Sequence, residues 1–214
     1  MEVLLGYPIL RGPIRCDMDV SPHKYLVFNK PYGILSSFTD SDGRPTLAQY
    51  IKTPYVYAAG RLDLDSEGLL LLTSDARLRH RITDPRYKVW KTYWVQVERV
   101  PTEEALSTLR SGVFLKGKKT RPAKVKRLSS EPCLWPRAVP IRYRKHVPTE
   151  WLQIEIREGV NRQIRRMTAT VGYPTLRLAR VRIGSLYLEH LQPGESREMT
   201  KEEVDALYQS CFDH

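Results

Sequence analysis

The chain has 214 residues, of which 41% are hydrophobic and 28% charged, as in a globular domain with a sizeable core, and its formal net charge is +11. No apolar run is long enough to cross a bilayer, and the first residues lack the basic segment and apolar stretch of a secretory signal. Cys16, Cys133 and Cys211 are far apart and form no CxxC pair, which argues against a disulfide framework or a zinc site and predicts a reducing cytoplasm.

Residues 1–22 are rich in turn-forming residues and are predicted to be an N-terminal tail ahead of a domain that spans 23–214. Runs of alternating, β-branched or aromatic residues then predict a series of strands. In chain order the predicted strands are 24–31, 55–60, 69–75, 91–98, 120–129, 151–158 and 178–189. The run 69–75 is apolar on both faces, so we expect it to be buried on both sides.

Four segments are predicted to be helical from their capping signals and apolar spacing. They are a short helix at 46–51, a helix at 76–83, a helix at 101–112 and a C-terminal helix that begins at Thr200. Thr200 and Glu203 have the spacing of a capping box. The segment 130–148 has several prolines and little periodicity, which predicts a long surface loop. Because strands dominate and no βαβ rhythm is present, the sequence predicts an α+β fold on a largely antiparallel sheet.

The basic residues are clustered rather than spread evenly. Lysine and arginine number 35 against 24 acidic residues, an excess that favours a polyanionic partner such as a nucleic acid. Arginine, whose planar guanidinium grips phosphate in a bidentate way, dominates both clusters. The clusters consist of Arg137, Arg142, Arg144, Lys145 and His146, and of Arg157, Arg162, Arg165, Arg166, Arg177, Arg180 and Arg182.

Acidic residues gather in the stretch "GRLDLDSEGLLLLTSD", residues 60–75, just before and after the buried strand. A calcium loop is a poor interpretation, because the twelfth place counted from Asp63 is Ser74 where such a loop needs a bidentate Glu. A carboxylate that attacks or stabilises the anomeric carbon of a sugar is another option, and Asp63 follows a predicted strand and the turn-forming Gly60. The remaining alternative is that these acids only cap turns or pair with arginines.

Four stretches in the same order resemble the motifs of the small-subunit (RsuA-like) family of ribosomal RNA pseudouridine synthases. They are "FNKPYGILSS" at 28–37, "GRLDLDSEGLLLLTSD" at 60–75, "KTYWVQVE" at 91–98 and "EGVNRQIRRM" at 158–167. The resemblance covers about 24–200 and implies that family's fold, with two lobes and flanking helices around a central RNA-binding cleft. Only 23 residues precede the core, so the N-terminal RNA-binding module of many members is missing, as in the E-type branch of the synthases that modify the large subunit.

The resemblance implies isomerisation of one uridine of 23S ribosomal RNA to pseudouridine. In this reaction the bond between N1 of uracil and C1′ of ribose breaks, and the base is rejoined through C5, without a cofactor or a metal. Asp63 would be the catalytic carboxylate, either attacking C1′ or removing a ribose proton, and Tyr93 the active-site tyrosine. Arg165 would be the basic partner of Asp63, a role that would keep a partly buried carboxylate ionised.

The target base must leave its stem to be reached, and Arg61, next to the motif aspartate, is the candidate to hold the gap open. Further along the chain, Val160, Ile164, Met167 and Val171 are spaced as an apolar helix stripe. Ile164 is therefore either a wall of the uracil pocket or simple core. The remaining predicted RNA contacts are Arg162 and Arg166 beside this stripe, and Arg142, Arg144 and Lys145 of the basic loop.

Two other functions remain open from the sequence. The first is an RNA-binding or ribosome-assembly protein on the same fold without catalysis. The second is a glycoside or nucleoside hydrolase, which would normally need a second carboxylate at a defined separation. The expected partner is ribosomal RNA, free or in an assembling particle, and no membrane. A monomer is expected, because the sequence has no feature of a paired interface.

Overall fold

A computed structural model describes residues 23–137, 139–141 and 146–212. The predicted tail 1–22 and the predicted RNA contacts Arg142, Arg144 and Lys145 lie outside the described residues. One nine-stranded sheet runs through the molecule, in the order β11-β1-β3-β9-β4-β8-β7, with β2 paired to β3 and β10 paired to β9. Among the pairs between these strands, only β3 with β9 is parallel, which confirms the α+β fold with a largely antiparallel sheet.

The bounds of the strands agree with most of the predicted runs. The strands of the main sheet are β1 Tyr25–Lys30, β2 Tyr57–Ala58, β3 Glu67–Thr73, β4 Lys91–Glu98, β7 Lys124–Arg127, β8 Thr149–Ile156, β9 Thr175–Ile183, β10 Leu186–Tyr187 and β11 Ser196–Glu198. A separate hairpin consists of β5 Phe114–Leu115 and β6 Lys118–Lys119. The helical segments are η1 Leu47–Gln49, α1 Ala76–Thr83, η2 Pro85–Tyr87, α2 Glu103–Ser111, α3 Gln163–Thr170 and α4 Lys201–Phe212.

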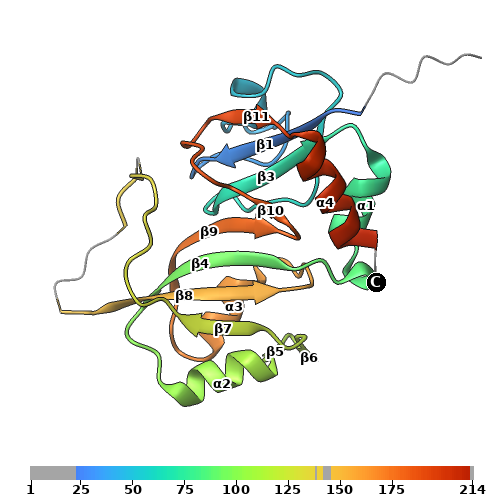
Figure 1. Ribbon diagram of the computed structural model, residues 1–214. Helices are drawn as coiled ribbons and strands as arrows, with labels where there is room; N and C mark the ends of the chain where they lie inside the picture. Colours follow the sequence, from blue (N-terminus) through green and yellow to red (C-terminus); the bar gives the residue numbers. More distant parts are fainter. Residues whose placement is uncertain (1–22, 138, 142–145, 213–214) are drawn as a thin grey trace, which may run out of the picture.

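The half of the sheet that contains β1 and β3 is covered on both faces. Figure 1 shows α1 and α4 beside these strands, and their side chains, including Leu78 and Leu207, pack with Leu69 and Leu71. Side chains from the 47–56 segment pack on the opposite face against Leu70 and Leu72. Leu69–Leu72 are therefore fully buried, as the unbroken apolar run predicted.

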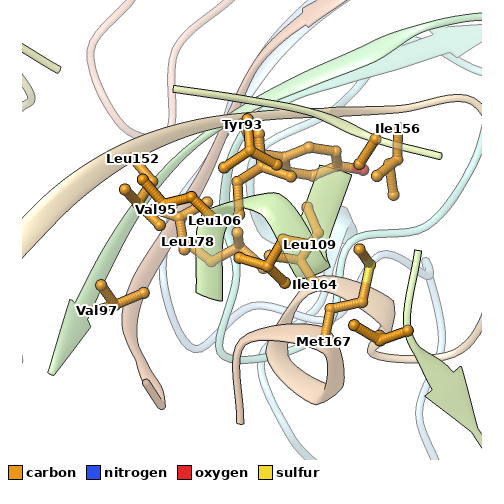
Figure 2. Close-up of a cluster of buried hydrophobic side chains, with 14 of the residues drawn as sticks. Tyr93, Val95, Val97, Leu106, Leu109, Leu152, Ile156, Ile164, Met167 and Leu178 are labelled. Carbon is orange, nitrogen blue, oxygen red and sulfur yellow. The ribbon is translucent and has the colours of Figure 1, made fainter. Parts of the chain in front are cut away.

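The other half of the sheet, with β4, β8 and β7, has its main core on one face only. Figure 2 shows this core, in which Tyr93 and Val95 of β4 lie with Leu106 of α2 and with Ile164 and Met167 of α3. The alternation of β4 accounts for this arrangement, because successive residues of a strand point to opposite faces of the sheet. Tyr93 therefore reaches the helix-covered face together with the residues of the last sequence motif.

The helix caps follow the sequence signals closely. The Asp75 carboxylate accepts hydrogen bonds from the backbone N–H groups of Arg77 and Leu78 at 2.9 and 3.0 Å and so caps α1. Thr200 and Glu203 form the predicted capping box, with reciprocal bonds of 2.9 and 3.2 Å. The acid at the end of the buried strand is thus a cap, one of the roles that the sequence left open.

Several predicted bounds are wrong. The predicted strand 178–189 is a hairpin, because Gly184 has a φ of 55° and the chain turns between Ile183 and Leu186. The predicted helix 46–51 is a single 3-10 turn, and the hairpin β5–β6 and strand β11 were not predicted. Val160 lies before α3 and is 42% exposed, so it does not belong to the buried stripe of that helix. The 3-10 turn, the hairpin β5–β6 and strand β11 are short elements, in which two or three residues carry too little periodicity to show a pattern.

Candidate active site

A cavity of about 550 Å³ opens on the helix-covered face, beside the loop between β2 and β3. Its walls include five of the residues predicted from the sequence. These are Arg61, Asp63, Tyr93, Arg162 and Ile164. They come from the 60–66 loop, from β4, and from the start of α3, so residues about 100 positions apart in the sequence meet in one place.

Asp63 is positioned by the residue before it. The Leu62 side chain is buried, its backbone N–H donates to Ser36 Oγ at 3.0 Å, and Ser36 Oγ donates to its carbonyl at 2.8 Å. The Asp63 carbonyl accepts a bond from the Ser66 N–H at 3.1 Å, which closes a turn. The carboxylate that these contacts leave in the cavity is 32% exposed at its side chain, so a substrate can reach it.

Two arginines at the start of α3 surround the aspartates of the loop. Arg162 has a left-handed φ of 50° at the N-cap and directs both terminal nitrogens to Asp65, at 2.8 Å each. Its Nη1 also lies 3.8 Å from Asp63 Oδ2. Arg165 Nε lies 3.3 Å from Asp65 Oδ2, and its Nη2 donates to the Asp65 carbonyl at 2.5 Å.

This geometry differs from the predicted pairing. We expected Arg165 to be the partner of Asp63, but the ion pair of Asp63 is with Arg162, while Arg165 pairs with Asp65. The reason is the left-handed N-cap, which brings Arg162 over the loop and was not visible in the helical spacing. Burial alone would raise the pKa of Asp65, but the hydrogen bond from Arg162 and the charge of Arg165 outweigh it and lower that pKa.

Tyr93 and Ile164 form the apolar wall of the cavity. They are 8% and 4% exposed and belong to the same core cluster (Figure 2). The sequence left open whether Ile164 is core or lines a pocket, and the structure shows that it packs in the core and also lines the cavity. Arg166 is half-buried, donates to the Asn161 carbonyl at 3.5 Å, and is not among the described residues that line the cavity.

The structure adds buried cations that the sequence interpretation did not single out. Lys30 Nζ donates to the carbonyls of Pro31 and Ser66 at 2.8 Å each. Burial lowers its pKa to about 8, although nearby Glu67, Asp65 and Asp63 act in the opposite direction. Lys91 and Arg180 line the cavity itself and are also buried. The signal was present for Lys30 and Lys91, because each lies within one of the four family motifs.

Glu67 holds the 130–137 segment against the sheet. This carboxylate is buried and lies 2.9 Å from Nη2 of Arg177, 2.9 Å from Nε1 of Trp135 and 3.8 Å from Nε of Arg137. Arg137 in turn lies over the Tyr32 ring, 3.6 Å from its centre. Glu67, Asp65 and Asp75 therefore pair or cap, and Asp63 is the acid of this stretch whose carboxylate faces the cavity.

Comparisons with known proteins show the family of this chain. A family model described as RNA pseudouridylate synthase matches residues 24–170. The chain belongs to the RNA pseudouridylate synthase family. It is 59% identical over 174 residues to the ribosomal large subunit pseudouridine synthase E of Xanthomonas campestris, covering 80% of this chain and 93% of that protein. Over 182 residues it is 53% identical to the protein of the same name from Vibrio parahaemolyticus, covering 85% and 76%.

A solved structure gives the same family assignment. A pseudouridylate synthase crystal structure superposes with a TM-score of 0.73 and 32% identity, covering 87% of this chain and 74% of that one. The predicted family, the E-type branch within it and the pseudouridine synthase fold are thereby confirmed. Ribosomal small subunit pseudouridine synthase A of Escherichia coli is more distant, at 35% identity over 190 residues.

The geometry brings together groups of three kinds. A carboxylate lines the same cavity as an aromatic ring, an aliphatic side chain and an arginine. Such a site can hold a planar base and act on the adjoining sugar carbon. The described residues contain no cluster of three His, Cys, Asp or Glu side chains that could hold a metal. No helix in the described part of the chain is long and apolar enough to cross a membrane.

Proposed function

We propose that this protein converts one uridine of large-subunit ribosomal RNA into pseudouridine, with Asp63 as the catalytic carboxylate. The observation that carries the proposal is that Asp63 lines the same cavity as Tyr93 and lies 3.8 Å from Arg162. The relatives at 53% and 59% identity are named as synthases of the large ribosomal subunit, which supports 23S RNA as the substrate.

In the proposed reaction the target uridine is flipped out of its stem and its base enters the cavity. The N1–C1′ bond breaks, the uracil turns, and a C5–C1′ bond forms, while C5 loses a proton and N1 gains one. Asp63 either attacks C1′ and forms a transient ester, or removes a ribose proton. Both routes return the carboxylate to its starting state, so no oxidant or co-reactant is consumed.

The surrounding residues have separate proposed roles. Tyr93 would pack on the uracil, and its hydroxyl would help move the C5 proton. Arg162 fixes the orientation of the Asp63 carboxylate, and Arg165 acts through Asp65, whose carboxylate and carbonyl it binds. Ile164 closes the apolar wall and limits the water that reaches the cleaved sugar carbon.

RNA binding is proposed to extend beyond the cavity. Arg61 is exposed at its edge and would occupy the gap left by the flipped base. Arg166 and the basic loop with Arg142, Arg144 and Lys145 would contact phosphates, so that affinity falls as salt rises. We further propose that residues 23–214 form one catalytic domain of two lobes, and that the protein acts as a monomer in the cytoplasm.

The hydrolase alternative is weakened by the state of the second aspartate. A glycosidase of the usual kind needs a protonated carboxylic acid near the leaving group. Asp65 is the nearest candidate by sequence, but its pKa is lowered and its oxygens are occupied by Arg162. A carboxylate held ionised in this way is a poor general acid.

Tritium release tests the proposed function and its substrate class. Transcripts of 23S and 16S RNA carrying tritium at C5 of uridine are incubated separately with the protein, and released tritium is counted. We expect release of one tritium per 23S molecule and none from 16S. Release from neither RNA, when given both as free transcripts and within particles of the assembling subunits, would contradict the proposal.

A further inference from the structure

Two buried cations line the catalytic cavity apart from the arginines that pair with its aspartates. Lys91 begins β4 and is 8% exposed, and Arg180 of β9 is 1% exposed. Buried charges are normally matched by an opposite charge, because burial removes their hydration. Among the described residues, neither cation has an ion pair with a carboxylate; their side-chain hydrogen bonds there are all to backbone carbonyls.

These carbonyls use only part of the donor capacity. Arg180 Nε donates to the Leu69 carbonyl at 2.8 Å, and Nη2 donates to the Gly60 carbonyl at 3.4 Å. Within the described residues, Lys91 Nζ has one hydrogen bond, of 3.3 Å, to the Val89 carbonyl. A guanidinium has five N–H donors and an ammonium three, so donors of both side chains remain for a ligand.

The electrostatics around Lys91 favour an added anion. Burial, together with the smaller effect of the Arg180 charge, lowers the pKa of its ammonium to about 8, and among the described groups the buried thiol of Cys211 acts in the opposite direction. Among the other cavity cations, Arg162 is already bound by Asp65 and Asp63, and Arg61 is exposed to water.

The two cations are close to the catalytic loop. The Gly60 carbonyl binds Arg180, and the chain reaches Asp63 three residues later. Gly60 itself has a φ of 87°, and a Cβ built there would lie 3.7 Å from Cγ2 of Thr83 and 4.0 Å from Nη1 of Arg180. The cations therefore lie within the space that a whole nucleotide would need, beside the position expected for its reacting sugar.

We propose that Lys91 and Arg180 form a phosphate subsite, which holds a backbone phosphate of the flipped-out uridine. The proposal rests on the proposed function, because it assumes that a uridine of an RNA chain enters the cavity. Uracil is neutral and cannot match two buried positive charges. The phosphate attached to the 5′ or 3′ oxygen of the same nucleotide is an anion that can, through charge-assisted hydrogen bonds.

Binding of small nucleotides tests this subsite without turnover. The dissociation constants of uridine and of uridine 3′,5′-bisphosphate are measured by NMR titration at fixed ionic strength. The proteins compared are the wild type, Lys91→Met, and Lys201→Met, which removes an exposed lysine of α4 as a matched loss of charge. We expect the wild type and Lys201→Met to bind the bisphosphate about tenfold more tightly than uridine. In Lys91→Met this preference should fall below about threefold, while the affinity for uridine is unchanged.

Other outcomes would overturn the subsite. Equal weakening of both ligands in Lys91→Met would show a structural role for the lysine, and a wild type without preference for the bisphosphate would show that no phosphate is held. Tritium release from ribosomal RNA is measured in parallel. A protein that releases tritium but lacks the preference refutes the subsite alone, and one that has the preference but releases none refutes the proposed function alone.

Discussion

Replacing Lys91 by Met should make the protein more stable at neutral pH. Methionine has a similar length and no charge, and it can fill the same buried space beside β4. The wild-type lysine is 8% exposed, has one hydrogen bond of 3.3 Å, and has the positive charge of Arg180 nearby. A charge in such surroundings raises the free energy of the folded wild type, and the uncharged methionine of the variant avoids this cost.

The lowered pKa gives the size of this cost. A fall from the ordinary 10.5 to about 8, at about 1.4 kcal/mol for each tenfold change in the protonation equilibrium, corresponds to about 3 kcal/mol at pH 7. Below pH 8 the lysine is charged in both the folded and the unfolded protein, so the wild type bears the whole cost. Between pH 8 and 10.5 the folded lysine loses its proton first, the unfolded state binds more protons, and the stability of the wild type rises with pH.

Urea unfolding of both proteins at several pH values measures this difference. We expect the variant to be more stable by about 3 kcal/mol at pH 7 and by about 1 kcal/mol at pH 10. Arg180 and Cys211 are present in both proteins, so the difference between the two curves isolates Lys91. Lys201→Met should show no such pH dependence, because that lysine is exposed.

A difference in stability that is the same at pH 7 and pH 10 would refute the reasoning, because it would arise from packing and not from charge. A variant that is less stable than the wild type at pH 7 would refute it as well. The expected result has a functional meaning, because a residue kept at a cost in stability is typical of binding sites. It would therefore agree with the proposed phosphate subsite.

Three further substitutions have defined expected results. Gly68→Ala should lower the free energy of unfolding in urea by more than about 4 kcal/mol, because φ is 99° and the new Cβ would lie 2.3 Å from a backbone oxygen of β9. Gly172→Ala is the control: φ is 91° there, a Cβ would meet nothing within 4 Å, and the free energy of unfolding should fall by about 1 kcal/mol. Asp65→Asn should lower kcat about tenfold or more with little change in thermal stability, because it removes the ion pairs of the Asp65 carboxylate with Arg162 and Arg165; an unchanged kcat would contradict the positioning role. Arg177→Met should destabilise the fold by about 3 kcal/mol in the same unfolding assay, because it removes an ion-pair partner of the buried Glu67 carboxylate. An effect under about 1 kcal/mol would show that the remaining partners of Glu67 are enough to stabilise its charge.

Local signals in the sequence predicted the parts of the fold that local physics decides. The bounds of α1 and β4 agree with 76–83 and 91–98, because a cap aspartate and strict alternation mark them. Thr200 and Glu203 formed the capping box that their spacing indicated. The burial of residues 69–72 was predicted correctly because this run is apolar at every position.

The missing parts depend on contacts between distant segments. Arg180 was placed in a basic cluster expected to bind a polyanion, but its side chain is buried, and its Nε donates to the Leu69 carbonyl 111 residues away. The ion pair of Asp63 with Arg162, in place of the predicted pair with Arg165, depends on one left-handed residue, which helical periodicity does not reveal. The family motifs led to Asp63, Tyr93 and Ile164 on the cavity wall and also contain Lys91, whereas the position of Arg180 on the same wall depends on the three-dimensional fold.

The catalytic role of Asp63 is tested most directly by the nucleosides that the protein forms. Large-subunit ribosomal RNA is incubated with the wild type, with Asp63→Asn, and with Asp42→Asn, a change at an exposed aspartate outside the cavity. The RNA is then digested and its uridine, pseudouridine and free uracil are quantified by mass spectrometry. We expect one new pseudouridine per RNA with the wild type and Asp42→Asn, and none with Asp63→Asn. Pseudouridine formed by Asp63→Asn at the wild-type rate, or free uracil in its place, would contradict the assignment of this site.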